Sequence, residues 1–184
     1  MSEIKTLYGT VSASVFEKCK TIKLVVFDVD GVFSDGNIYM GNNGEELKAF
    51  NTKDGYGIKA LASCGIQTAV ITGRQSNIVE KRMQSLNVNY IIQGREDKNT
   101  AMIELMEVSG FKAYQIASMG DDMPDLGLFA HSAIKASVND AHPMVKREAN
   151  YITSLGGGKG AVREFCDLFL QVNNKLEFSH GASL

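Results

Sequence analysis

Short apolar segments alternate with helical patterns along most of the chain, and this alternation limits the possible folds more than any other feature. Six segments are typical of strands that are apolar on both faces, being rich in Val, Ile, Ala and Tyr. These segments cover residues 22–29, 67–72, 89–93, 113–119, 132–137 and 150–153. The helical patterns cover 55–63, 76–86, 98–109, 123–130, 141–148 and 160–175. The alternation predicts a Rossmann-like three-layer α/β sandwich with a parallel sheet.

Residues 37–50 break the alternation. Two β-like runs flank the turn sequence Gly-Asn-Asn-Gly at 41–44, which predicts a β-hairpin. At 184 residues the chain is most simply one domain, residues 1–184, and the predicted strands and helices leave no room for a separate cap domain. The hairpin has more apolar side chains than a two-stranded ribbon buries, so we expect it to pack against hairpins of other subunits. These side chains are Ile38, Tyr39, Met40, Leu47 and Phe50.

Polar and charged residues follow four of the predicted strands. Because ligands bind at the carboxyl ends of strands in open parallel sheets, we expect these residues to line one edge of the sheet. Their order along the chain is two acids, a hydroxyl with a cation, a lysine, and a second group of acids. The residues are Asp28 and Asp30, Thr72 and Arg74, Lys98, and then Asp121, Asp122 and Asp125.

This set of side chains suits a phosphate ester. Carboxylates form an oxygen-only site of the kind that Mg²⁺ prefers. Thr72 can donate a hydrogen bond, and Lys98 adds a fixed positive charge. Phosphoryl transfer depends mainly on positioning and on charge neutralisation. Asp28 could act as a nucleophile and Asp30, two residues later, as general acid and then base.

The order D-x-D-G, T-G-R, K and G-D-D-x-x-D, spread over residues 28–125, resembles that of the haloacid dehalogenase-like phosphatases. The resemblance implies that Asp28 is the nucleophile, that it forms an aspartyl-phosphate, and that Asp30 is the acid/base. Asp28, the backbone carbonyl of Asp30, and Asp121 would bind Mg²⁺, while Thr72 and Lys98 would hold the phosphoryl group.

Longer stretches are similar to the family of 3-deoxy-D-manno-octulosonate 8-phosphate (Kdo 8-phosphate) phosphatases. They include residues 28–61, 71–74, 120–125, 140–143 and 156–168. The resemblance implies a cytosolic homotetramer that makes Kdo for lipopolysaccharide synthesis, and a tail, 173–184, that closes a neighbouring active site. It places Asp30, Asn51, Thr52, Lys53, Asp54, Gly55, Lys59, Arg74, Arg82 and Lys98 around the substrate. The family often has an arginine where this chain has Lys59, which bears on substrate preference.

Several residues also have purely structural interpretations. Asp54 could cap a helix that begins at Gly55, and Lys98 could be a solvated residue of a first helical turn. Asp125 either supports the site or caps the helix at 123. Gly-Gly-Gly-Lys-Gly at 156–160 lacks the frame of a nucleotide-binding P-loop, so it is either a plain connection or a set of amides facing an anion.

Other functions remain as alternatives. A phosphatase of a nine-carbon keto-deoxy sugar acid 9-phosphate would use the same chemistry. A non-catalytic binding member of the fold would lack a catalytic residue, and here all of them are present. A nucleotide-dependent transferase would need a nucleotide-binding loop, which this sequence lacks.

Charge and hydropathy restrict the partners. A net charge of −2 without a basic run gives no electrostatic case for nucleic acid. No apolar segment approaches the length of a membrane span, and the first 20 residues lack the apolar centre of a signal peptide. Three cysteines without paired spacing favour reduced thiols. We therefore expect a cytoplasmic enzyme with a small-molecule substrate.

Overall fold

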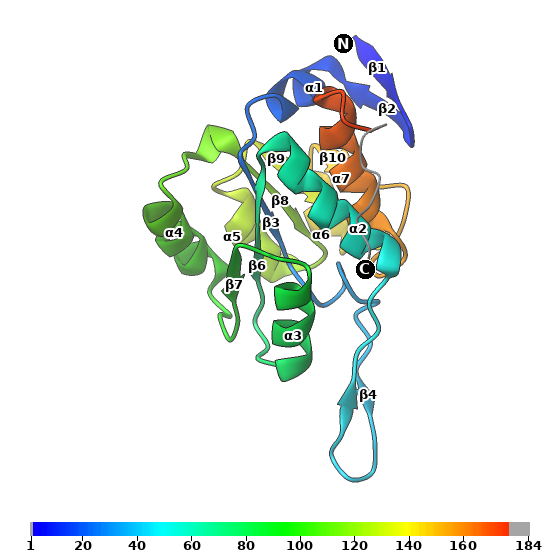
Figure 1. Ribbon diagram of the computed structural model, residues 1–184, viewed down its shortest axis with the longest axis vertical. Coiled ribbons are helices and arrows are strands. Elements are labelled where there is room, and N and C mark those ends of the chain that lie inside the picture. Colours follow the sequence, from blue (N-terminus) through cyan, green and yellow to red (C-terminus); the bar gives the residue numbers. More distant parts are fainter. Residues whose placement is uncertain (1, 177–184) are drawn as a thin grey trace.

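A six-stranded sheet forms the centre of the protein, as Figure 1 shows for the computed structural model, which describes residues 2–176. All neighbouring strands are parallel, in the order β10-β9-β8-β3-β6-β7. The strands are β3 (Leu24–Phe27), β6 (Gln67–Ile71), β7 (Tyr90–Ile92), β8 (Ile116–Gly120), β9 (Ile134–Ser137) and β10 (Tyr151–Ile152). This arrangement confirms the predicted α/β class. The predicted strand at 113–119 was wrong in its first part, because Ala113–Gln115 is a turn of 3-10 helix.

Seven α-helices lie within the described part of the chain. They are α1 (Ala13–Cys19), α2 (Thr52–Leu61), α3 (Asn77–Ser85), α4 (Lys98–Ser109), α5 (Leu126–Phe129), α6 (Pro143–Glu148) and α7 (Ala161–Val172). The predicted helix at 123–130 is a 3-10 turn, Met123–Asp125, followed by the single turn of α5.

The central strand β3 separates two hydrophobic clusters. Its four residues are fully buried and point alternately to the two faces of the sheet. Val25 and Phe27 belong to a cluster that includes residues of α2, α3 and α7, whereas Leu24 and Val26 pack with residues of α4 and α5. The sheet therefore lies between two layers of helices, and burial on both faces explains why its strands are continuously apolar.

The predicted hairpin at 37–50 is present and projects away from the body of the protein (Figure 1). Its strands, β4 (Tyr39–Met40) and β5 (Glu46–Leu47), pair antiparallel. Ile38, Tyr39, Met40 and Leu47 are exposed as expected. Phe50 differs from the expectation, because it is half-buried and packs against the larger hydrophobic cluster.

The N-terminal segment forms structure that the sequence did not predict. β1 (Glu3–Thr6) and β2 (Gly9–Ser12) pair antiparallel and lead into α1, whose first turn Ser12 caps. These strands are four residues long and largely polar, so their periodicity is too weak to detect from the sequence.

Within residues 2–176, no helix is both long enough and apolar enough to cross a membrane. The predicted tail, 173–184, begins at Asn173, which ends α7. Residues 177–184 of that tail lie outside the described residues.

Candidate active site

A cavity of about 550 Å³ opens at the carboxyl ends of β3, β6 and β8. Its volume is typical of a site for a small ligand. Predicted residues from four separate segments of the sequence meet here, as expected for the edge of a parallel sheet. The lining residues are Asp28, Asp30, Gly36, Thr72, Gly73, Arg74, Glu96, Lys98, Asp121, Asp122, Pro124 and Asp125.

Asp28 and Asp30 reach the cavity by a turn rather than by strand alternation. β3 ends at Phe27, although the amide of Asp28 still donates to the Met119 carbonyl at 3.0 Å. The chain then turns through Gly31, whose φ is +85°. A Cβ on Gly31 would lie 2.0 Å from Oδ2 of Asp121, so glycine both suits the positive φ and leaves room for the Asp121 carboxylate. The turn thus brings the acids of β3 and β8 together.

Lys98 is buried, so the interpretation of it as a solvated residue is wrong. Its Nζ lies 2.7 Å from Oδ1 of Asp28 and 2.6 Å from Oδ1 of Asp125. Burial alone would lower the pKa of Lys98, but the two carboxylates outweigh burial and raise it. Lys98 therefore stays charged where a phosphoryl group would be negative.

Asp125 supports the site through three hydrogen bonds. Its Oδ1 accepts from Lys98, and its Oδ2 accepts from the amides of Asp121 and Asp122 at 2.8 and 3.1 Å. The turn at 123 is capped by Asp122, whose side chain accepts from the amide of Met123. Asp125 completes a capping box with Asp122 at this turn, so both open interpretations of Asp125 hold: it caps the turn and it supports the site through Lys98.

The three carboxylates of Asp28, Asp121 and Asp125 leave an excess of negative charge. Each offers an oxygen within 4.8 Å of the others, and with all three ionised the one ammonium among them leaves two negative charges. Burial, and then the charge of Asp125, raises the pKa of Asp28; burial, and then the charge of Asp28, raises that of Asp121. Oδ1 of Asp121 is buried and has no hydrogen-bond partner among the described residues. Oxygen ligands with this charge fit a divalent cation such as Mg²⁺.

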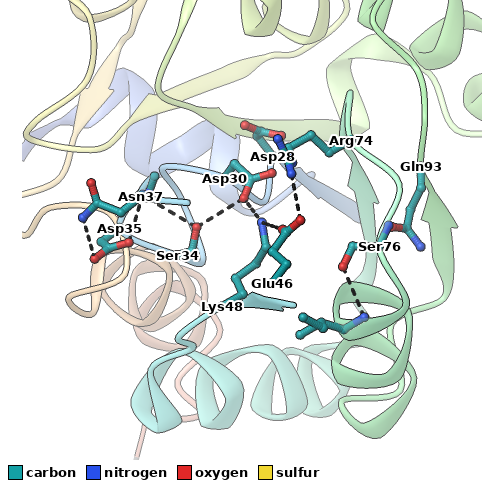
Figure 2. Close-up of polar contacts among 12 residues, drawn as sticks. Asp28, Asp30, Ser34, Asp35, Asn37, Glu46, Lys48, Arg74, Ser76 and Gln93 are labelled. Carbon is teal, nitrogen blue, oxygen red and sulfur yellow. Dashed lines mark hydrogen bonds and ion pairs between the residues drawn. The ribbon is translucent and has the colours of Figure 1, made fainter. Parts of the chain in front are cut away.

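Thr72 and Arg74 follow β6 on the cavity wall. Thr72 is buried and its amide donates to the Ile92 carbonyl. It does not cap the next helix, because Ser76 does so by accepting from the amide of Ile78 at 3.2 Å (Figure 2). Thr72 and the half-exposed Arg74 both line the cavity.

Two hairpin residues that the sequence analysis did not select extend into this region. Figure 2 shows a chain of alternating charges, in which Lys48 pairs with Asp30 and Glu46 pairs with Arg74. Nη2 of Arg74 lies 2.9 Å from Oε2 of Glu46, and Nζ of Lys48 lies 4.0 Å from Oε1 of the same glutamate. Lys48 follows β5 directly, and no signal in the sequence distinguishes Glu46 and Lys48 from the other charged residues of the hairpin.

Seven other predicted substrate residues lie at the start of α2, along α2 or on α3, and none of them lines this cavity. They are Asn51, Thr52, Lys53, Asp54, Gly55, Lys59 and Arg82. Asn51 caps α2 by accepting from the amide of Lys53, so the helix begins at Thr52 and not at Gly55. Asp54 does not cap its own helix, since its Oδ1 accepts from the amide of Arg163 in the first turn of α7 at 2.8 Å.

The environments of the remaining members of that group differ. Thr52 and Lys53 are exposed, Gly55 is buried and Lys59 is half-buried. The guanidinium of Arg82 lies 6.0 Å from the centre of the Phe50 ring.

The glycine-rich loop at 156–160 packs against the turn that carries the first acids. The amide of Gly157 donates to Asp140 and that of Gly158 to the Val32 carbonyl, so both amides are already paired. A Cβ on Gly157 would lie 1.8 Å from the Gly31 carbonyl oxygen. The loop therefore supports the turn at Gly31 by close packing, which agrees with the interpretation of the loop as a plain connection.

Comparisons with known proteins give a consistent result. A family model for haloacid dehalogenase-like hydrolases matches residues 91–162. The chain is 44% identical over 183 residues to 3-deoxy-D-manno-octulosonate 8-phosphate phosphatase KdsC of Escherichia coli K12, covering 100% of this chain and 97% of that protein.

Two crystal structures have the same fold. That of the Yersinia pestis 3-deoxy-D-manno-octulosonate 8-phosphate phosphatase superposes with a TM-score of 0.93 at 45% identity, covering 96% of this chain and 95% of that one. The Moraxella catarrhalis phosphatase, solved with magnesium ion, phosphate ion and KDO, gives 0.86 at 42% identity, covering 89% and 95%.

Proposed function

This chain belongs to the Kdo 8-phosphate phosphatase family of haloacid dehalogenase-like hydrolases, and we propose that it hydrolyses Kdo 8-phosphate to Kdo and inorganic phosphate with Mg²⁺, in lipopolysaccharide synthesis. The observation that carries the proposal is the carboxylate cluster. When ionised it has two excess negative charges, and one Asp121 oxygen has no partner within residues 2–176, which together match one divalent cation. The relatives named for this activity, and the relative that contains magnesium, phosphate and KDO, support the substrate and the metal.

The proposed roles follow from the positions around the cavity. Asp28 would attack phosphorus, and Lys98 would neutralise the charge on the phosphoryl oxygens with a hydrogen bond from Thr72. Asp30 would give a proton to the departing sugar oxygen and then take one from the water that cleaves the aspartyl-phosphate. Asp28, Asp121 and the Asp30 carbonyl would hold Mg²⁺, which supplies positive charge at the phosphate.

The residues at the start of α2, together with Arg74 and Arg82, would recognise the sugar acid. Arg74 is the one among them that lines the cavity. Lys59 would supply a point charge in place of the planar guanidinium of an arginine. It would therefore bind a carboxylate with less directional preference than an arginine would.

A homotetramer in the cytoplasm completes the proposal. Met40 and Leu47 are 74% and 67% exposed at the end of a two-stranded hairpin, which is more apolar surface than such a ribbon normally leaves in water. Packing of hairpins from several copies would cover these side chains and close the cavity. Three free cysteines suit a reducing compartment. A fully active monomer in light scattering would contradict the tetramer.

Phosphate release from a panel of sugar phosphates, with Mg²⁺ and with a chelator, tests the function. We expect metal-dependent release strongly biased to Kdo 8-phosphate. A preference for a nine-carbon keto-deoxy 9-phosphate would retain the chemistry and change the substrate. Release that is independent of metal, or no release from any ester by folded protein, would contradict the proposal.

A further inference from the structure

Lys48, at the base of the hairpin, has its ammonium buried against the first acidic motif. Its side chain is 2% exposed, and its Nζ pairs with Oδ1 of Asp30, with Oε1 of Glu46 4.0 Å away. A lysine is rarely buried to this extent without an anionic partner, because desolvation of the charge is costly. The hairpin therefore places a fixed positive charge directly against the residue to which the proposed mechanism gives the proton transfers.

The contacts of Asp30 fall on one oxygen. Within the described residues, Lys48 and the Ser34 hydroxyl, at 3.5 Å, both donate to Oδ1. A charge-assisted hydrogen bond holds a carboxylate more firmly than a neutral one does. Oδ2 is then the oxygen that can carry the transferred proton. This arrangement fixes the rotation of an aspartate that lies on a turn rather than in a strand.

Lys48 is itself held by neighbouring charges. Glu46, two residues earlier, bonds Arg74 through Oε2 and faces Lys48 with Oε1 (Figure 2). Arg74 belongs to the cavity wall. The charges of the hairpin base thus connect the end of β6 with the turn after β3, and Lys48 is the member that contacts Asp30.

We propose that Lys48 is a positioning residue that orients Asp30 for proton transfer to the leaving oxygen. The inference rests on the proposed function. In the first step a carboxylate oxygen of Asp28 bonds to phosphorus, the bond from phosphorus to the sugar oxygen breaks, and that oxygen takes the proton of Asp30. In the second step water attacks the aspartyl-phosphate, its proton passes to Asp30, and the Asp28–phosphorus bond breaks. Lys48 exchanges no proton in either step.

Leaving-group dependence separates positioning from a purely structural role. A sugar alkoxide needs a proton as it departs, whereas p-nitrophenolate does not, so a misplaced acid slows only the first. Single-turnover release of Kdo and of p-nitrophenol, with enzyme in saturating excess, isolates the step that phosphorylates Asp28.

For Lys48→Met we expect Kdo release to slow about ten- to hundredfold, and p-nitrophenol release to change by less than about threefold. Lys48→Arg, which keeps the charge, should restore most of the rate. Lys5→Met, which removes an exposed lysine on β1, is the matched control and should leave both rates unchanged. Should Lys48→Met fail to fold, Lys48→Gln retains a donor and allows the same comparison.

A double variant tests whether Lys48 acts through Asp30. In an Asp30→Asn background, Lys48→Met should add less than about a twofold loss, because residues that act through one another are not additive. Full additivity, or equal slowing of both leaving groups, would overturn the proposal in favour of direct substrate contact or hairpin anchoring. If the wild-type enzyme cleaves p-nitrophenyl phosphate but not Kdo 8-phosphate, the proposed substrate is wrong, and the role of Lys48 is still open to test. The same comparison, made with the best alkyl phosphate of the panel, would then decide the role of Lys48.

Discussion

Two regions of the molecule differ in how fully their side chains find partners within one chain. They are the acidic cluster at the ends of β3 and β8 and the hairpin of β4 and β5. In the cluster, Lys98 pairs with two carboxylates, and close packing at Gly31 holds the two loops together. In the hairpin, the charged base is paired with cavity residues, while the apolar end is exposed. The chain therefore builds its own chemical centre, whereas a single chain leaves the apolar end of the hairpin uncovered.

Asp28→Asn should have the largest effect on that centre. An amide cannot form the aspartyl-phosphate, so we expect turnover to fall by at least about 10⁴-fold, in the range seen when a nucleophile is removed. Phosphate-release assays measure the loss. Thermal unfolding and Mg²⁺-dependent binding of substrate should persist and serve as controls. Retained turnover would remove Asp28 as the nucleophile.

Lys98→Met tests whether the cluster depends on its internal cation. Two buried carboxylates would lose their partner, and we expect the free energy of unfolding in chelator to fall by roughly 3–5 kcal/mol. Urea unfolding measures the change, with Lys5→Met as the surface control. An unchanged midpoint would mean that the ion pairs contribute little to stability.

Asp54 connects the helix after the hairpin to α7, and its burial predicts a pH effect. Burial raises the pKa of Asp54 from 3.8 to about 6 in the folded chain. The folded protein thus binds this proton more tightly, and the resulting stability is present below about pH 4 and lost as the pH rises to about 6. The loss is roughly 3 kcal/mol.

Asp54→Asn removes this titration while keeping an oxygen for the Arg163 amide. The stability of the variant relative to wild type should therefore rise by roughly 3 kcal/mol between pH 4 and pH 7. Urea unfolding of both proteins at the two pH values gives the difference. A constant difference across this range would show that Asp54 is ionised throughout.

Met40→Asp should have the smallest effect on the folding of one subunit. The side chain is exposed, so its replacement should change the free energy of unfolding by less than about 0.5 kcal/mol. The introduced charge should nevertheless disrupt packing between hairpins, and light scattering should show smaller species. Asn42→Asp, which adds the same charge in the turn, is the matched control. An unchanged particle size in light scattering would contradict the proposed packing between hairpins.

Local periodicity was sufficient to predict the parallel sheet, most of its helices and the hairpin. The strand-end rule was sufficient to predict that Asp28, Thr72, Lys98 and Asp121 would meet. Both signals depend only on neighbouring residues and on the direction of strands. The β1–β2 ribbon escaped detection because its short strands are largely polar.

The sequence by itself therefore determined the layered fold and the edge of the sheet at which chemically active side chains gather. Only the tertiary structure decided their partners: that Lys98 contacts both Asp28 and Asp125, that Lys48 contacts Asp30, and that Asp54 caps a helix 109 residues away. The physical reason is that ion pairing and burial depend on the final approach of distant loops and helices, which side-chain packing sets and local patterns do not encode.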